Sequence, residues 1–338
     1  MLQQTRVAAV VPYYERFIAR FPTLAALAAA REEEVLELWS GLGYYARGRR
    51  LHAAAREALA RYGALPGSYD ALLSLPGFGP YTAGAVASIA FALPVPCVDG
   101  NAARVLSRVF LVEGALDEPA SRRSLWSLAA ELVPYLRPGD FNQALMELGA
   151  TLCGKPVPRC ERCALSPVCR AHKAGRQGQI PRARKRPAAA VLDVACAVVR
   201  RGEALALTRR PSGGLFGGLW ELPSAVVPPG EDARVALRRG LAASLGLHVS
   251  PGAAVASLTR DLTHRRLRLT AYACRADALS RGVALVRSRR RGTLAMATAM
   301  RRLLAAVDLA AFAIPEYGGQ ALSRPGAIGV VIARKNPS

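Results

Sequence analysis

The sequence has no apolar run long enough to cross a bilayer, no secretory signal pattern at its start and no internal repeat. Acidic residues are also scarce, since 24 Asp and Glu stand against 46 Lys and Arg and give a formal net charge of +22. We therefore expect no association with membranes. The excess of positive charge favours a polyanionic partner, because each neutralised phosphate releases counterions.

The seven cysteines are not distributed like a disulfide framework. Cys153, Cys160, Cys163 and Cys169 follow one another with the spacing Cys-x6-Cys-x2-Cys-x5-Cys. Four thiolates in one compact loop can surround a zinc ion or an iron–sulfur cluster, and the spacing alone leaves both open. In a chain of this length, such clustering indicates a reducing, cytoplasmic setting.

The 338 residues, 51% of them hydrophobic, suffice for two domains that each bury a core. Apolar residues recur at helical spacing through residues 1–170, which predicts an all-α first domain. The basic stretch 171–190 is typical of a solvated linker that can also touch DNA. Strand patterns joined by a hairpin then predict an α+β domain over 191–308. We assign no role to the tail, 309–338.

Within the second domain, strands are expected at four places and helices at two. The expected strands are 191–200, 203–208, 254–259 and 266–273, and the expected helices are 234–245 and 298–307.

Residues 75–104 form the most informative stretch. Gly77 and Gly79 flank Phe78, and no Lys-Ser/Thr pair follows them, which argues against a nucleotide-binding loop. A glycine hairpin between helices can present N–H groups to a DNA phosphate without reading sequence, although an ordinary connection is the alternative. Asp99, the single acid in this stretch, can be a helix N-cap or a catalytic carboxylate.

The LPGFGPYTAGA hairpin, the VDGNAARV segment and the cysteine spacing together resemble the helix-hairpin-helix DNA glycosylases that carry a [4Fe–4S] cluster. The segments MLQQTRV, WSGLGYYARGRRLH and FNQALMELGATLC are similar to the MutY-type adenine DNA glycosylases. The resemblance implies base excision repair, in which adenine opposite 8-oxoguanine or guanine in double-stranded DNA is released by hydrolysis of its N-glycosidic bond. We expect a monomer in the bacterial cytoplasm, associated with the nucleoid through DNA.

The resemblance also implies roles for individual residues. Asp99 would stabilise the positive charge on the sugar as the base leaves, in a pocket that Tyr81 and Asn101 also line. Gly77 and Gly79 would hold the phosphate beside the flipped nucleotide. The [4Fe–4S] cluster would be ligated by Cys153, Cys160, Cys163 and Cys169. Adenine would be read by Gln143, and the oxidised guanine would be contacted by Gln4, Thr5, Leu42, Tyr44, Thr263 and His264.

Three of these assignments have ordinary structural alternatives. Gln143 can be a helix-surface glutamine, Tyr44 a core aromatic, and His264 a structural histidine. Tyr81 is more telling, because relatives of the endonuclease III type carry a lysine there, and that amine forms a Schiff base and cuts the strand. A tyrosine cannot do this, so we expect base excision without efficient strand cleavage.

The second domain resembles the MutT-like (Nudix) fold, most clearly in LTRRPSGGLFGGLWELPS. Gly240, Ala243 and Ser244 occupy the places of the glutamates that bind magnesium in the hydrolases. We therefore expect recognition of the lesion rather than pyrophosphate hydrolysis.

One departure from the family pattern concerns the proton donor. The family has a catalytic glutamate two residues before the Met of MLQQT, and this sequence begins at that Met. We expect either an internally assigned start or a truncated protein. Two alternative functions follow: a catalytically inactive protein that binds the lesion, and a glycosylase for another mispaired base.

Overall fold

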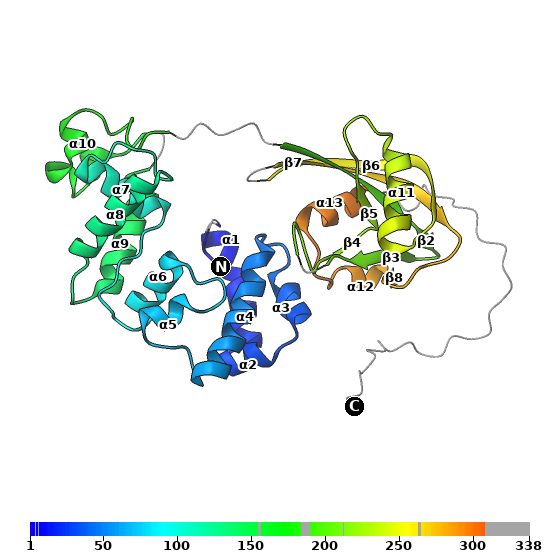
Figure 1. Cartoon of the computed structure of the whole chain (residues 1–338), viewed down its shortest axis with the longest axis horizontal. Coiled ribbons are helices and arrows are strands. Elements are labelled where there is room, and N and C mark those ends of the chain that lie inside the picture. The colour runs from blue at the N-terminus through cyan, green and yellow to red at the C-terminus, as the bar shows by residue number, and fades with distance from the viewer. Residues whose placement is uncertain are drawn as a thin grey trace.

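The computed structural model describes residues 1–3, 5, 7–154, 157–183, 190–211, 213–262 and 265–307. It contains a helical domain followed by a domain of strands and helices, with α1–α4 lying between the rest of the helical domain and the sheets (Figure 1). This order confirms the predicted fold class. The Gln4, Thr263 and His264 assignments and the tail 309–338 lie outside the described residues.

The first domain is helical throughout its described part, as predicted. Its helices are α1 (Val7–Arg20), α2 (Leu24–Ala29), α3 (Glu32–Trp39), α4 (Tyr45–Tyr62), α5 (Tyr69–Leu73), α6 (Pro80–Ala90), α7 (Gly100–Phe110), α8 (Pro119–Leu132), α9 (Pro138–Thr151), η1 (Cys160–Arg162), η2 (Ser166–Val168) and α10 (Arg170–Lys173). Local signals set several helix starts, because Thr23 and Ser68 accept backbone N–H groups as N-caps. Among these residues, no helix has the length and apolarity that crossing a lipid bilayer requires.

The second domain is built on two sheets. Its strands are β1 (Ala190–Val198), β2 (Arg200–Arg201), β3 (Ala204–Arg209), β4 (Trp220–Glu221), β5 (Ser224–Val226), β6 (Val249–Asp261), β7 (Arg265–Ala276) and β8 (Val283–Arg287). One sheet has the order β5-β1-β7-β6 with β1 and β7 parallel, and the other joins β2, β3, β4 and β8. The helices are α11 (Ala233–Leu245), α12 (Ser288–Arg291) and α13 (Thr298–Ala306). The four predicted strands and two predicted helices are present within a few residues, whereas β4, β5, β8 and α12 were not predicted.

Part of the stretch predicted as a linker, 171–190, packs on the first domain. Ile180 is buried, and its carbonyl accepts a hydrogen bond of 2.9 Å from Nε of Arg108 in α7. Arg176 forms an ion pair of 2.6 Å with Glu113. Residues 171–183 therefore pack on the first domain despite their basic, weakly apolar composition.

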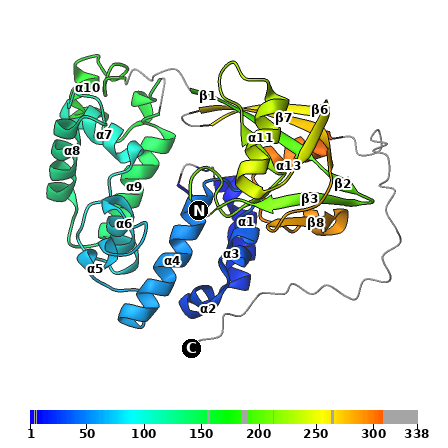
Figure 2. The same ribbon diagram turned by 45° about the vertical axis from the view of Figure 1, so that its right-hand side comes forward.

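The two domains share one hydrophobic core. Leu36 and Trp39 of α3 are fully buried in the same cluster as Met296, which precedes α13. Nε1 of Trp220 also donates a hydrogen bond of 3.1 Å to Oε1 of Glu33. Figure 2 shows α1 and α3 beside the strands of the second domain. This contact fixes the second domain against the helices that precede the glycine hairpin.

Candidate active site and cysteine cavity

The glycine hairpin lies between α5 and α6 and has the predicted form. Gly77 adopts a left-handed φ of +78°, and a Cβ there would lie 2.6 Å from the Cβ of Arg50, so position 77 requires glycine. Gly79 is the residue before α6, with open space around it and Pro80 as the first helical residue. The first N–H groups of a helix have no intrahelical acceptor, so this end of α6 can bind an anion such as a phosphate.

Asp99 is the N-cap of α7, which confirms the structural alternative for this residue. Its Oδ1 accepts hydrogen bonds from the N–H groups of Asn101 (2.9 Å) and Ala102 (2.7 Å). Its Oδ2 accepts a third from Nδ2 of Asn101, at 3.1 Å. The carboxylate is half-buried and oriented by all three donors. Capping fixes the carboxylate without removing its ability to stabilise a cation.

Tyr81 lies near Asp99, at the start of α6. Burial, and to a smaller extent the nearby Cys97 and Asp99, raises the pKa of Tyr81 to about 12, so its phenol is neutral at pH 7. The hydroxyl faces the sulfur of Met146 in α9, at 3.8 Å. Burial and the charge of Asp99 likewise raise the pKa of the Cys97 thiol to about 12. Tyr81 and Cys97, which both lie near Asp99, are therefore uncharged at pH 7.

Asn142, which sequence reasoning missed, holds the backbone that leads to Asp99. It is almost fully buried, and its Nδ2 donates to Ser88 Oγ (2.9 Å) and to the carbonyl of Val95 (3.0 Å). Its Oδ1 accepts the N–H of Cys97, at 3.2 Å. In the sequence, only its place directly before Gln143 in the FNQ segment marks it.

Gln143 itself lies on the exposed side of α9 and donates to the carbonyl of Gly139, at 3.2 Å. This position fits the helix-surface alternative. No hydrogen bond among the described residues joins Gln143 to Asp99 or Tyr81, so its role in reading adenine stays a prediction.

The loop between α3 and α4 buries Leu42 and exposes Tyr44. Leu42, predicted to enter the duplex, is 8% exposed and packs in the shared core. Tyr44, for which a core position was the alternative, is 44% exposed with a left-handed φ of 50°. The core aromatic is instead its neighbour Tyr45. Leu42 is therefore buried in this structure and Tyr44 is exposed, and the duplex contacts of both stay predictions.

Contacts connect this loop to the active-site helix. The guanidinium carbon of Arg47 lies 5.0 Å from the centre of the Tyr44 ring, and Nη1 of Arg47 donates to the carbonyl of Gln3. Nε2 of Gln3 donates to Thr82 Oγ1, at 3.4 Å, next to Tyr81. The hydroxyl of Thr5 donates to the same Gln3 carbonyl at 3.5 Å. The predicted duplex contacts Thr5 and Tyr44 therefore lie in one connected group with α6.

The four clustered cysteines line one cavity, together with residues of α7, α9 and α10. The buried Arg108 donates to Cys153 Sγ (3.1 Å) and to the carbonyls of Cys153 (3.0 Å) and Gly154 (3.2 Å). Among the described residues, no three His, Cys, Asp or Glu side chains converge on one point as a single metal ion requires. Four thiols lining one cavity beside a buried guanidinium are a donor set of the kind that holds an iron–sulfur cluster, in which the ligands bind different irons.

Arg104 connects this cavity to Asp99. Its Nη2 donates to Oδ1 of Asn101 (2.9 Å) and to the carbonyl of Gly149 (2.6 Å), and its Nε donates to the carbonyl of Cys153 (2.8 Å).

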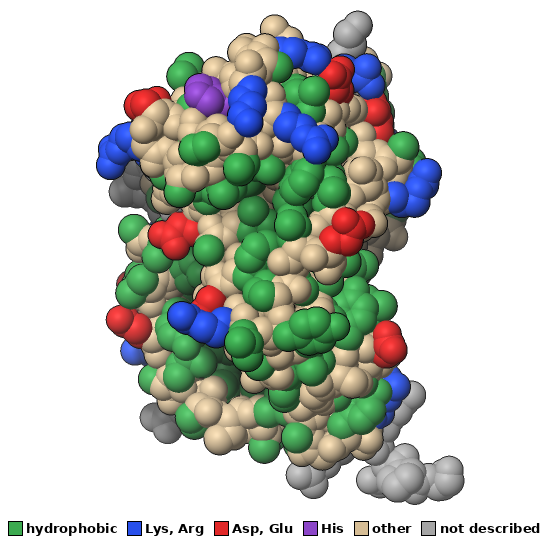
Figure 3. Space-filling model, turned by 90° about the vertical axis from the view of Figure 1, so that its left-hand side faces the viewer, with side chains coloured by type: hydrophobic (Ala, Val, Ile, Leu, Met, Phe, Trp, Pro, Cys, Tyr) green, Lys and Arg blue, Asp and Glu red, His purple; other side chains and the backbone are tan. Residues whose placement is uncertain are grey.

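Figure 3 shows basic side chains gathered at the end of the face that carries α10 and the cysteine loop, with apolar side chains over its middle.

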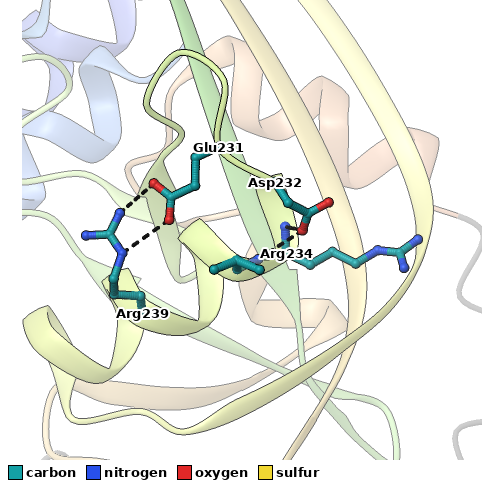
Figure 4. Close-up of polar contacts among 5 residues, drawn as sticks. Glu231, Asp232, Arg234 and Arg239 are labelled. Carbon is teal, nitrogen blue, oxygen red and sulfur yellow. Dashed lines mark hydrogen bonds and ion pairs between the residues drawn. The ribbon is translucent and has the colours of Figure 1, made fainter.

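The second domain has no hydrolase-like carboxylates on α11. Gly240 packs closely against Ala225, and Ser244 donates to the carbonyl of Gly240 at 2.7 Å. The acids before the helix are engaged elsewhere. Glu231 pairs with Arg239 at 2.7 Å, and Asp232 caps α11 (Figure 4). Helix α11 therefore carries no carboxylate, and recognition of the lesion without pyrophosphate hydrolysis stays a prediction.

Comparison with known proteins shows the family. Residues 1–131 match the HhH-GPD superfamily of base excision DNA repair proteins, and residues 194–306 match the NUDIX domain. The chain is 40% identical over 274 residues to an adenine DNA glycosylase of Rattus norvegicus, covering 68% of this chain and 53% of that protein. It is 48% identical over 176 residues to an adenine DNA glycosylase of Mycolicibacterium smegmatis, covering 52% of this chain and 59% of that protein.

Among solved structures, a thermostable thymine-DNA glycosylase is 30% identical, with a TM-score of 0.47 over 51% of this chain and 80% of that one. The chain spans about half the length of the curated relatives that it matches. It belongs to the HhH-GPD superfamily. Its helical domain, its NUDIX domain and its relatives place it, within that superfamily, in the family of MutY-type adenine DNA glycosylases, which confirms the resemblance seen in the sequence.

Proposed function

We propose that the protein excises adenine mispaired with 8-oxoguanine or guanine, by hydrolysing the N-glycosidic bond in double-stranded DNA. The observation that carries this proposal is the Asp99 carboxylate, which three N–H donors hold beside Tyr81 at the start of α7. Relatives named adenine DNA glycosylase support adenine as the base. The net charge of +22 suits binding to DNA. We place the protein as a monomer in the bacterial cytoplasm, associated with the nucleoid.

In the proposed reaction, the adenine nucleotide leaves the base stack because its glycosidic bond cannot be reached inside the duplex. The N–H groups at the start of α6 hold the phosphate beside it. As the base departs, the sugar acquires positive charge, which the fixed carboxylate of Asp99 stabilises without reorganisation. Water then adds to the sugar and gives up one proton, and the departing adenine takes up one proton, so that free adenine and an abasic sugar are formed. Tyr81 offers a neutral phenol and no amine, so no Schiff base forms and the strand stays intact.

Cys153, Cys160, Cys163 and Cys169 are proposed to hold a [4Fe–4S] cluster, to which Arg108 contributes a buried positive charge. When bound, such a cluster ties its loop into one shape and can carry an electron. A chain of hydrogen bonds links this loop to the active site, because Arg104 binds both the Cys153 carbonyl and Asn101, and Asn101 binds Asp99. The NUDIX domain is proposed to recognise the oxidised guanine, since α11 lacks the glutamates for hydrolysis.

A single-turnover assay tests the function. Duplexes with adenine opposite 8-oxoguanine, adenine opposite guanine and thymine opposite guanine are incubated with excess protein, and abasic sites are measured after alkali. We expect release from the first two only, with no strand break before alkali. Release of thymine, or of no base, would contradict the proposal.

One observation favours a second candidate function, binding of the lesion without excision. Protonation of adenine requires a nearby acid, and Asp99, the carboxylate whose charge acts on Tyr81 and Cys97, is already assigned to stabilising the sugar cation. Tight, selective binding to the 8-oxoguanine duplex with no release in the same assay would support this alternative.

A further inference from the structure

The loop from Gly41 to Tyr44 is tied at both ends to a single residue of the second domain. Ser40 Oγ, just before the loop, donates to the carbonyl of Met296 at 3.1 Å and accepts the N–H of Met296 at 3.3 Å. The hydroxyl of Tyr45, just after the loop, donates to the same carbonyl at 3.0 Å. Residues more than 250 positions away in the sequence thus close the base of this loop.

Further hydrogen bonds make this contact a small network. The Tyr45 hydroxyl also accepts the N–H of Gly41, at 3.2 Å, so it joins the two ends of the loop directly. Nη2 of Arg301 in α13 donates to Ser40 Oγ at 3.1 Å. Tyr45 and Met296 are buried, 5% and 1% exposed. Polar groups in such an apolar setting are costly to leave unpaired, so the network strongly prefers one arrangement.

The backbone of the loop needs this support. Gly41 and Gly43 have φ values of +102° and +81°, and Tyr44 has a left-handed φ of 50°. A non-glycine residue in that region is strained and persists only where its surroundings determine it. Nε1 of Trp39, the last residue of α3, donates a hydrogen bond to the Gly43 carbonyl at 3.0 Å. The exposed ring of Tyr44 is therefore presented from a backbone held by contacts that include the second domain.

We propose that the second domain positions the loop that probes the base opposite adenine, by clamping it through Met296, with Ser40, Tyr45 and Arg301 as positioning residues. This inference rests on the proposed function, in which Tyr44 contacts the oxidised guanine. The NUDIX domain thereby gains a second role, since it fixes a reading element of the helical domain in addition to any contact of its own with the lesion.

The test compares Tyr45→Phe with Tyr135→Phe in the full chain. The control removes the same hydroxyl from a side chain that is 87% exposed, far from the loop in sequence and absent from the clamp. Hydrogen exchange of the amides at 41–44 reports the loop directly. Equilibrium binding is measured with duplexes that carry 2′-fluoro-2′-deoxyadenosine, which resists excision, opposite 8-oxoguanine or guanine.

Tyr45→Phe removes a hydroxyl that makes two hydrogen bonds, to Met296 and from Gly41. We expect exchange at 41–44 to rise at least about five-fold, the effect of losing one such bond, while the middle of α4 exchanges as before. The ratio of the affinities for the 8-oxoguanine duplex and the guanine duplex should fall by a similar factor, while the affinity for undamaged duplex stays unchanged. Ser40→Ala should act in the same direction, and Ser40→Thr, which keeps the hydroxyl, should restore the wild-type values. Tyr135→Phe should change neither readout.

The proposal is overturned if Tyr45→Phe leaves loop exchange unchanged, if exchange rises equally along α4, or if a loosened loop keeps the full preference for 8-oxoguanine. Failure of the proposed function gives a different result. In that case the unmodified chain itself would not distinguish the two duplexes, whatever the exchange data show.

Discussion

Asp99 has two roles that one substitution can separate. As an N-cap it accepts the N–H groups of Asn101 and Ala102, and an asparagine oxygen can accept the same bonds. As a catalytic group it must carry negative charge, which asparagine lacks. We predict that Asp99→Asn lowers the single-turnover excision rate at least about 100-fold, while duplex affinity and unfolding temperature change little.

A matched control for this substitution is available in the second domain. Asp232 caps α11 by accepting the N–H groups of Arg234 and Val235, in the same arrangement as Asp99. Asp232→Asn removes the same charge and keeps the same kind of cap, so it should leave excision unchanged. Equal rates for Asp99→Asn and the unmodified chain would remove the carboxylate from the mechanism.

Arg108 allows a test of the cysteine cavity. Its guanidinium is 2% exposed and donates to Cys153 Sγ and to three backbone carbonyls. Arg108→Met leaves these acceptors buried without a donor, at a cost of about 3 kcal/mol. We predict less bound iron and a weaker absorbance band at the blue end of the visible spectrum. Arg162→Met, an exposed change in the same loop, should retain the iron. Purified protein with zinc alone would contradict the [4Fe–4S] assignment.

At the scale of elements, the two glycines of the hairpin between α5 and α6 differ in how much space they leave for a side chain. Gly77 has a φ of +78° and no room for a Cβ beside Arg50, whereas Gly79 has open space. We predict that Gly77→Ala costs about 1–3 kcal/mol of stability and weakens duplex binding, measured by thermal unfolding and by fluorescence anisotropy. Gly79→Ala should unfold like the unmodified chain. Equal unfolding temperatures for the two variants would show that the turn tolerates a side chain at position 77.

Elements with strong local signals could be predicted from the sequence. The helices of the first domain follow the apolar period, and the hairpin of β2 and β3 follows from Arg201-Gly202, where the glycine has a φ of 55°. The missed strands β4 and β5 have two and three residues, too few to show a period. β8, with five residues, depends on its pairing with β3, and no local pattern marks it. Tertiary pairing decides such segments.

Site residues that belong to a sequence motif could be predicted. Residues whose role depends on which side chains are buried in the folded protein could not. Asp99 and Tyr81 lie near each other, and the four cysteines line one cavity, as their motifs indicated. Leu42 and Tyr45 have roles that depend on which side of the loop faces the second domain, and local periodicity contains no such information. Asn142 was missed for a related reason, because its partners belong to α6 and to the segment before α7.

At the scale of the whole molecule, the boundary between the two domains in the sequence does not coincide with the boundary between the clusters of buried residues. Side chains of α1, α3 and α4 are buried in the same cluster as β3 and α13, while the lobe around α7 and α8 has a separate cluster. The first domain therefore contains one part packed on the NUDIX domain and another that is independent of it. Changes in α3 should reach the second domain, and changes in α8 should not.

A pair of identical truncations tests this division. Leu36 in α3 is fully buried in the shared core, and a Cβ on Gly218 would lie 3.6 Å from its Cδ1. Leu125 in α8 is 1% exposed but belongs to the separate cluster. Each Leu→Ala change should cost about 2–5 kcal/mol, because each leaves a cavity. We predict that only Leu36→Ala speeds hydrogen exchange in α13, since only its cavity adjoins the second domain. Faster exchange in α13 for both variants would instead mean that the helical domain opens as a single cooperative unit.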